Sequence, residues 1–343
     1  MPITVASRPL GVSVMPLENR REAILRIATT ADRLGYEAVF LTETWAHDTT
    51  VLLSEVAART QRIHLGSGVL GVWGRSAATL AMAASTLHAV SEGRFILGLG
   101  ASTAQLTEGL HDVPFETPVK QMRRVLTQVR ALLKGDRVPL AVATGARPLR
   151  LNLPPTPTLP IYLAGLAEET IRLAGELADG WFPFLFPYAR LAEGVALLNE
   201  GASRNSRAGH VPAVCPFIPA VAADNPADAR NGAAWFLVFY MTSMGPFYPK
   251  MLARQGFQKE VDAIVAANPG RDSAVVVPPE AEGLLEQLTL FGTPEQARAR
   301  LTPWYAAGAS LPILLLRPNL SPEEIDFTLS AFRPDPPARG GYP

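Results

Sequence analysis

Residues 63–102 decide the fold, and they read IHLGSGVLGVWGRSAATLAMAASTLHAVSEGRFILGLGAS. A β-branched and aliphatic run broken by glycines (Ile63–Leu70) precedes a helical pattern at Ala77–Val90 and a short apolar strand at Phe95–Leu99. Glycines inside a strand mark a bulge or a place where a ligand approaches the backbone. Because both strands end in glycines, the sequence predicts bare backbone at their carboxyl ends, where an α/β fold places a flat cofactor.

The alternation of strand and helix patterns continues in both directions along the chain. Further strands are expected at Leu10–Met15, Ala38–Leu41, Ile161–Ala164, Trp181–Phe184, Val214–Ala222 and Leu311–Leu316. Helical spacing of apolar residues is found at Leu17–Leu34, Thr50–Ala58, Val119–Leu133, Glu168–Leu177 and Ala189–Leu198. About eight strands that alternate with helices predict an α/β fold with a parallel sheet, and the length favours a closed (β/α)8 TIM barrel over an open sheet.

We therefore expect one barrel domain over residues 1–332, with an insertion at about 223–287 and a loose tail at 333–343. The stretch between about Asn225 and Leu290 is too long for one βα unit. It contains an aromatic-rich helical pattern at Ala233–Met244, which we interpret as a substrate lid or an oligomer surface.

Composition excludes several classes of protein. Among 343 residues, 31 are Lys or Arg and 31 are Asp or Glu, so no overall field points to nucleic acid or an anionic membrane. The single cysteine, Cys215, excludes a disulfide framework. The first residues lack the pattern of a signal peptide, and the longest apolar run, around Ala233–Met241, is too short to span a bilayer. A soluble cytoplasmic protein is expected, and the low charged fraction of 18% favours an oligomer.

Two positions after the strands carry candidate chemistry, each with an ordinary alternative. Glu43 follows Ala38–Leu41 directly, where barrel enzymes place catalytic groups, or it caps the next helix. Asp48 is better placed for capping, which favours Glu43 as a site residue. At Gly68–Val69 the glycines allow a bulge or an unusual peptide geometry, or an ordinary strand end.

Other candidates depend on their loops. Arg75, beside Trp73, offers a bidentate cation to a phosphate or carboxylate, or is a surface arginine. Gly165–Ala167 opens a helix whose amides suit a phosphate, or forms a plain turn. His111 lies in a predicted loop after Phe95–Leu99, from which it reaches the site. The five histidines show no HxH or HExxH spacing, so no metal site is expected.

Taken together, these segments resemble the bacterial luciferase-like family of flavin- and deazaflavin-dependent oxidoreductases. The resemblance covers roughly residues 8–205 and 288–317, and includes FLTETWAHDTTVLLSEVAARTQRI, EGLHDVPFETPVKQMRRV, LPIYLAGLAEETIRLAGELADGW and FGTPEQARARLTPWYAAGASLPIL. It implies a (β/α)8 barrel with the cofactor ring in its mouth. The TETWxxD and HxVPF forms look most like the subgroup that uses coenzyme F420, with FMN as the alternative cofactor.

The resemblance also implies site residues. A bulge with a non-prolyl cis peptide at Gly68–Val69 would support the ring. The other positions that would contact the cofactor, including its phosphate, are Gly98, Gly100, Ala101, Ser102, Gly165, Leu166 and Ala167. Two departures matter: Glu43 is followed by Thr44 where many relatives have histidine, and Ala77 stands where relatives often have proline.

The expected function is hydride transfer between F420 and a small organic substrate. Glu43 and His111 are the candidates for proton transfer, Arg75 for the cofactor, and Trp45, Trp73 and Phe239 for the substrate pocket. An FMN-dependent monooxygenase supplied by a partner flavin reductase is the alternative, and a non-catalytic flavin-binding barrel is the third. A homodimer is expected, with the helix at Ala77–Val90 and its small-residue face (Ala77, Ala78, Ala81 and Ala84) at the interface.

Overall fold

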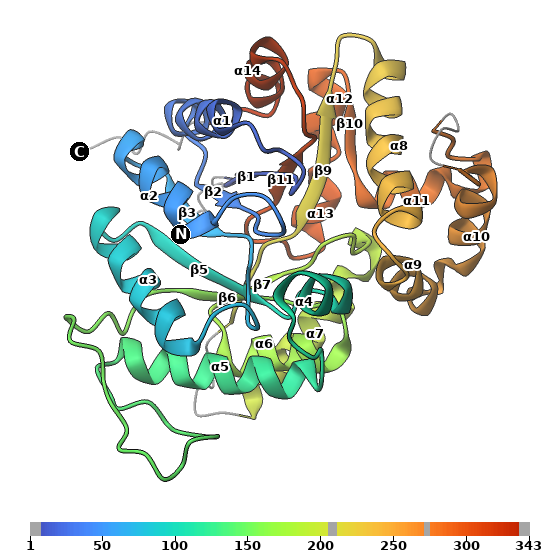
Figure 1. Cartoon of the computed structure of the whole chain (residues 1–343). Helices are drawn as coiled ribbons and strands as arrows, with labels where there is room; N and C mark the ends of the chain where they lie inside the picture. The colour runs from blue at the N-terminus through green and yellow to red at the C-terminus, as the bar shows by residue number, and fades with distance from the viewer. Residues whose placement is uncertain (1–7, 205–210, 271–274, 336–343) are drawn as a thin grey trace, which may run out of the picture. The chain divides into compact units, whose positions relative to one another are not determined.

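The computed structural model describes residues 8–204, 211–270 and 275–335. By its internal contacts the chain divides into two compact units. The first comprises Met1–Val39, Leu185–Ala192 and Cys215–Pro343, and the second comprises Phe40–Phe184 and Glu193–Val214. The strand β2 (Ala38–Leu41) begins in the first unit and ends in the second. Figure 1 labels the elements of both.

The first unit contains four parallel strands in the order β10-β9-β11-β1. They are β1 (Gly11–Val14), β9 (Phe217–Ala222), β10 (Leu290–Gly292) and β11 (Ile313–Leu316). Helices α1 (Arg21–Leu34) and α14 (Pro322–Ala331) pack against each other, and Arg26 pairs with Asp326 at 2.5 Å. The remaining short helices next to the strands are α12 (Pro294–Ala299) and α13 (Thr302–Ala306).

The predicted insertion at 223–287 has two parts. Helix α8 (Pro226–Thr242) begins before the predicted Ala233, because Asn225 caps it and Pro226 occupies its first turn. It packs on β9 and β10, as a helix between two strands of a βα fold does. The extra part is α9 (Phe247–Leu252), a π-helical turn (Ala253–Phe257) and α10 (Gln258–Ala267), after which a 3-10 turn and α11 (Glu282–Leu288) lead to β10.

The second unit contains parallel strands in the order β3-β5-β6-β7-β8, with β4 also paired to β5. The strands are β3 (His64–Ser67), β4 (Leu70–Gly71), β5 (Phe95–Gly100), β6 (Ile161–Ala164), β7 (Gly180–Phe182) and β8 (Ala213–Val214). The helices are α2 (Thr49–Arg59), α3 (Ala77–Val90), α4 (Ala104–His111), α5 (Pro118–Leu133), α6 (Glu168–Leu177) and α7 (Leu191–Ser203).

The outer helices of the second unit form a continuous row. Helix α3 packs against α2, α5 and β5, and α5 packs against α6 (Figure 1). Ala77, Ala81 and Ala84 of α3 are buried in this packing. Most of the predicted small-residue face is therefore turned inward, with Ala78 only partly buried, and a dimer interface through α3 stays a prediction.

Most predicted elements are confirmed, and the differences have local causes. The predicted strand Val214–Ala222 is two strands, β8 and β9, separated at Cys215 and Pro216. Proline lacks the amide that a continuous ladder needs. The strand β10 was missed because it spans three residues, Leu290–Gly292. Where a loop was predicted, α4 forms behind its cap, Thr103, and His111 is its last residue.

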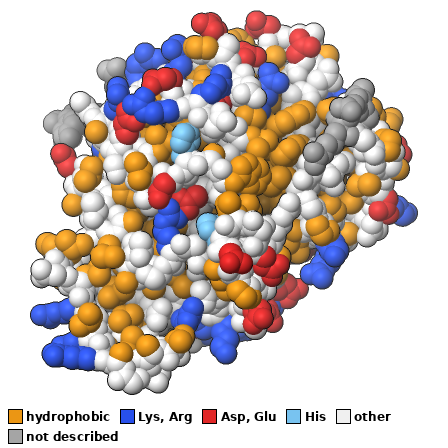
Figure 2. Space-filling model, viewed as in Figure 1, with side chains coloured by type: hydrophobic (Ala, Val, Ile, Leu, Met, Phe, Trp, Pro, Cys, Tyr) orange, Lys and Arg blue, Asp and Glu red, His pale blue; other side chains and the backbone are white. Residues whose placement is uncertain are grey.

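Two further expectations concern the whole chain. A single domain over residues 1–332 stays a prediction, and most of the predicted tail, residues 336–343, lies outside the described residues. No helix of the described parts is long and apolar enough to cross a membrane. On the face in Figure 2, basic and acidic side chains are interspersed, as their equal numbers in the sequence lead one to expect.

The close contact between α6 and α7 makes a testable prediction. A Cβ on Gly175 would lie 2.0 Å from the carbonyl oxygen of Leu198, and one on Gly201 would lie 2.0 Å from that of Arg172. Gly175→Ala should therefore destabilise the protein by about 1–3 kcal/mol in urea unfolding. The control, Gly109→Ala in α4, meets nothing within 4 Å and should be neutral or stabilising. Equal stabilities of both variants would contradict this packing.

Candidate active site

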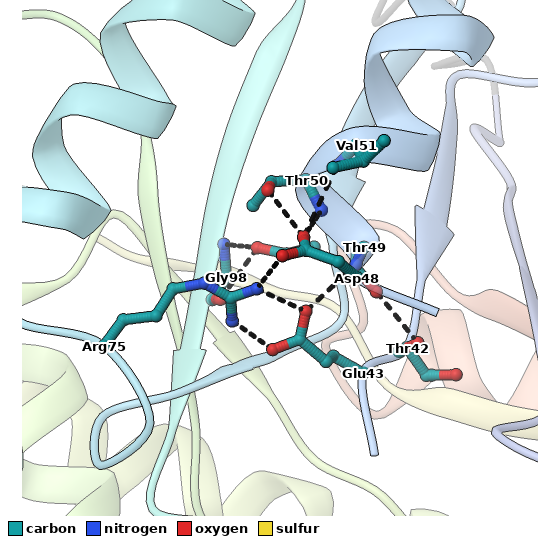
Figure 3. Close-up of polar contacts among 9 residues, drawn as sticks. Thr42, Glu43, Asp48, Thr49, Thr50, Val51, Arg75 and Gly98 are labelled. Atoms are coloured by element: carbon teal, nitrogen blue, oxygen red, sulfur yellow. Dashed lines mark hydrogen bonds and ion pairs between the residues drawn. The ribbon is translucent and has the colours of Figure 1, made fainter. Parts of the chain in front are cut away.

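An ion-paired cluster lies where β2 and β4 lead into their helices. Glu43 follows β2, Asp48 caps α2, and Arg75 precedes α3. Figure 3 shows the Arg75 guanidinium facing both carboxylates. Its two Nη atoms bind the two oxygens of Glu43, with Nη2 3.0 Å from Oε2, and Nη2 also lies 2.9 Å from Oδ2 of Asp48. The structure thus joins two predicted site residues, Glu43 and Arg75, to each other.

The same carboxylates hold the first turn of α2. The amide of Thr49 donates to Oε2 of Glu43 at 3.0 Å, and the amide of Thr50 donates to Oδ1 of Asp48 at 2.9 Å. Asp48 is the N-cap, as the sequence predicted. Glu43 is therefore fixed from two sides, by a cation and by a helix N-terminus.

The ion pair between Arg75 and Glu43 is mostly buried. The side chains of Arg75 and Glu43 are 17% and 14% exposed. The hydrogen bond to Glu43 raises the pKa of Arg75 although burial opposes this. Burial raises the pKa of Asp48, but hydrogen bonds from Thr50 and the charge of Arg75 outweigh burial and hold it below its ordinary value of 3.8. The cluster thus sets one guanidinium, Arg75, against two carboxyl groups, Glu43 and Asp48.

The backbone between β3 and β4 is a bulge against β5. The peptide bond between Gly68 and Val69 is cis, which is the geometry that the resemblance implies at this position and decides the alternative left open by the residues. A Cβ on Gly98 would lie 1.9 Å from the Ser67 carbonyl oxygen, and a Cβ on Gly100 would lie 2.7 Å from Cγ2 of Val69. These two glycines of β5 therefore make room for the bulge itself.

The loop after β4 is held by side chains from three other segments. Nε1 of Trp73 donates to the carbonyl oxygen of Ala101 at 2.7 Å, and its ring lies 5.5 Å from that of Phe115. A Cβ on Gly74 would lie 2.9 Å from the His111 ring. Gln121 donates from Nε2 to the carbonyl oxygen of Val72 at 3.0 Å. Gln121 was missed, because a polar residue in the first turn of a helix carries no signal of its own.

Two segments at the ends of β5 and β6 suit a bound anion or ring. Ser102 has a positive φ of 62°, a conformation that is uncommon outside glycine and concentrates at functional sites. Ala167 opens α6 without a side-chain cap, whereas Asp48, Ser76 and Thr103 cap α2, α3 and α4. Trp181 fixes the turn by donating to the Gly165 carbonyl oxygen at 2.7 Å. The first amides of α6, directly after Gly165–Ala167, have no side-chain cap, and helix N-termini of this kind suit a phosphate.

The second unit thus fits a cofactor with a flat ring and a phosphate. The bulge at Gly68 and Val69 would face the ring, and the α6 N-terminus, with Leu166 before it, would take the phosphate. Contact of these residues with a cofactor stays a prediction, as it does for Arg75, whose observed partners are carboxylates.

Two predicted pocket residues lie apart from these contacts. Trp45 is 49% exposed on the loop after Glu43. Phe239 belongs to the first unit, on α8, where it stacks on Trp235 with 5.3 Å between ring centroids. Among the described residues, no group of three or more His, Cys, Asp or Glu side chains is arranged to hold a metal ion.

The charge balance of the cluster is testable by removing its cation. Arg75→Met leaves Glu43 and Asp48 together without a compensating cation and should destabilise the protein by about 1–3 kcal/mol at pH 7 in urea unfolding. The control Arg123→Met removes a more exposed partner, 46% against 17%, from Glu176 and should cost less than about 1 kcal/mol.

The loss of stability in Arg75→Met should depend on pH in a definite direction. The pKa of Asp48 is lowered in the folded protein, so its stabilisation is present above its ordinary value of 3.8 and is lost as the pH falls through the folded value. The difference between wild type and Arg75→Met should therefore narrow below a pH of about 4. If Arg75→Met lost no more stability at pH 7 than Arg123→Met, the buried cluster would not depend on its cation.

Comparisons with known proteins identify the family and the fold. The family described as luciferase-like monooxygenase matches residues 4–311. A putative coenzyme F420-dependent oxidoreductase of Mycobacterium tuberculosis is 28% identical over 87% of this chain and 91% of its own length. The F420-dependent tetrahydromethanopterin reductase of Methanopyrus kandleri has a TM-score of 0.79 at 19% identity, covering 94% of this chain and 97% of that one.

A third similar protein binds a different cofactor. The oxygenating constituent of 3,6-diketocamphane monooxygenase of Pseudomonas putida, solved with FMN, has a TM-score of 0.73 at 16% identity, covering 96% of this chain and 97% of that one. At these identities the solved structures show the fold alone, and they confirm the predicted TIM-barrel type of α/β fold. Since the family match extends over nearly the whole chain, the protein belongs to the luciferase-like monooxygenase family of oxidoreductases.

Proposed function

We propose that this enzyme transfers a hydride between coenzyme F420 and a small organic substrate. The observation that carries the proposal is the close approach of the Ser67–Val69 bulge to Gly98 and Gly100, at the position where the F420-dependent subgroup supports its cofactor. The 28% identity to the putative coenzyme F420-dependent oxidoreductase of M. tuberculosis supports the same cofactor.

The chain's own residues would bind and orient. F420, when bound, supplies a ring that accepts or donates the hydride. The bulge would back the ring, the uncapped N-terminus of α6 would bind the phosphate, and Trp73, fixed by Ala101, would form one wall. Holding two reactants face to face is the protein's main contribution to the rate of such a reaction.

Glu43 and His111 are proposed to take part in proton transfer, and their surroundings differ. Both oxygens of Glu43 are bound, by Arg75 and by the Thr49 amide, so it would act as a fixed carboxylate near the reacting atoms. His111 is exposed as the last residue of α4. Of the two, His111 is the freer to exchange a proton with substrate.

Turnover with reduced F420 tests the reaction and the role of Glu43. Oxidation of the reduced cofactor would be followed by its fluorescence with a panel of carbonyl compounds, and the reverse reaction with alcohols. Glu43→Gln should lower turnover at least about tenfold while the circular dichroism spectrum is unchanged. The control Glu176→Gln removes the charge from a comparable bidentate pair, with Arg123, and should leave turnover within about twofold. Unchanged kinetics in Glu43→Gln would remove this residue from the mechanism.

The second candidate is an FMN-dependent monooxygenase that receives reduced flavin from a partner reductase. The FMN complex with a TM-score of 0.73 favours it, because that protein shares the fold and oxygenates its substrate. Oxygen uptake in the presence of reduced FMN and candidate substrates would distinguish the two functions.

We also propose a cytoplasmic location, which the buried free thiol of Cys215 and the lack of any second cysteine support.

We further propose a homodimer formed through the outer face of α3. This helix contains no Asp, Glu, Lys or Arg, although Met82 and Val90 are 45% and 49% exposed. Val51 on the neighbouring α2 is 70% exposed. A helix whose solvent face carries no charge is typical of a surface covered by another chain.

Sedimentation velocity tests this interface. Met82→Glu should shift the protein from dimer to monomer, because it places a charge in the centre of an apolar contact. Leu110→Glu, at a residue 51% exposed on α4, is the matched control and should remain a dimer. A monomeric wild type, or a dimer in both variants, would contradict the proposal.

A further inference from the structure

The pairing between β3–β4 and β5 changes register within the bulge. Leu65 lies opposite Phe95 and Gly66 opposite Ile96, an offset of 30 positions. Beyond the bulge Leu70 lies opposite Leu99 and Gly71 opposite Gly100, an offset of 29 positions. The β3–β4 side therefore carries one extra residue, which interrupts the ladder between the two pairings.

The side chain of Ser67 replaces the interrupted ladder. Its hydroxyl accepts a hydrogen bond from the amide of Gly98 at 2.9 Å and donates one to the carbonyl oxygen of the same residue at 2.8 Å. The neighbouring amide of Leu97 points the other way and bonds Pro160 on the β6 side. Both main-chain groups of Gly98 on the β3 side are thus satisfied by one hydroxyl.

Water cannot replace the Ser67 hydroxyl as the partner of the Gly98 main chain. Ser67 is fully buried, so water does not reach the two groups of Gly98 that it binds. On its other edge the bulge is held by the Gly68 amide, which donates to the carbonyl oxygen of Leu41 at 2.7 Å. Ser67 is therefore the side-chain contact that fixes the distance between the bulge and β5.

We infer that Ser67 is a positioning residue for the cofactor. Its hydroxyl fixes the distance of Gly68 and Val69 from β5, and from that position they would support the ring. This rests on the proposed function. The next contact shows how the position is transmitted: Cγ2 of Val69 lies over Gly100, close enough that a Cβ there would be 2.7 Å away. The Cβ of Ala164, on β6, is 3.4 Å from the same point, so Val69 and Ala164 both border the space that a side chain at position 100 would occupy.

A purely structural role would change stability alone, so the test separates stability from cofactor binding. Ser67→Ala removes the hydroxyl, and Ser67→Cys keeps most of its volume with a much weaker hydrogen-bonding group. The control is Ser85→Ala, which removes a buried hydroxyl from α3 in the same unit, 3.5 Å from that of Thr156. For each protein the dissociation constant of F420, the unfolding temperature and the hydrogen exchange of the Gly98 amide without cofactor would be measured.

We expect Ser67→Ala and Ser67→Cys to weaken F420 binding at least about fivefold, the lower end of what a lost buried hydrogen bond costs. Ser85→Ala should stay within about twofold of wild type. Exchange of the Gly98 amide should accelerate in both Ser67 variants and not in the control, whether or not cofactor is present. If Ser67→Ala fails to fold, Ser67→Cys carries the comparison.

The outcomes distinguish this inference from the proposed function. Tight binding of F420 by wild type together with unchanged binding by both Ser67 variants overturns the role of Ser67 and leaves the function standing. Binding of FMN in place of F420 by wild type overturns the proposed cofactor. The dissociation constants of FMN for the Ser67 variants and for wild type are then compared to decide the role of Ser67. If wild type binds neither F420 nor FMN, both the proposed function and the role of Ser67 are wrong.

Discussion

The approach of two backbones in the second unit, Ser67–Val69 against Gly98–Gly100, is the constraint on which the candidate site depends. Gly98 has to be glycine because a Cβ would lie 1.9 Å from the Ser67 carbonyl oxygen. The extra residue that bends β3 away from β5 would leave buried main-chain groups unpaired, and the Ser67 hydroxyl pairs them. In the proposed site the glycines would serve the cofactor indirectly, because they make room for the bulge that carries Val69.

The second constraint is electrostatic. Glu43 and Asp48 lie together at the start of α2, and Arg75 from the loop after β4 compensates their charge. Hydrogen bonds from Trp73 to Ala101 and from Gln121 to Val72 tie the same loop to the end of β5 and to α5. A site built in this way is preorganised, which is what a reaction carried by a bound ring needs from its protein.

Local signals in the sequence were enough for the elements and for some of the site. The apolar runs at Ala38–Leu41 and Ile161–Ala164 and the helical spacing at Ala77–Val90 agree with the structure to the residue. Partnerships over long separations were not predictable. Ser67 and Gly98 are 31 positions apart, Arg75 and Glu43 are 32, and Gln121 and Val72 are 49. Each of these polar residues also fits an ordinary surface or capping role, so nothing local distinguishes them. Helix α4 was missed for a related reason, since its eight residues, Ala104–His111, are too few to show a periodicity.

The central claim is that the second unit holds a deazaflavin in front of the bulge, and equilibrium binding tests it most directly. Purified protein would be titrated with oxidised F420 and, separately, with FMN, and the fluorescence of each followed. The account predicts a micromolar or tighter dissociation constant for F420 and much weaker binding of FMN. Tight binding of FMN with weak binding of F420 would contradict it and make the monooxygenase the leading function.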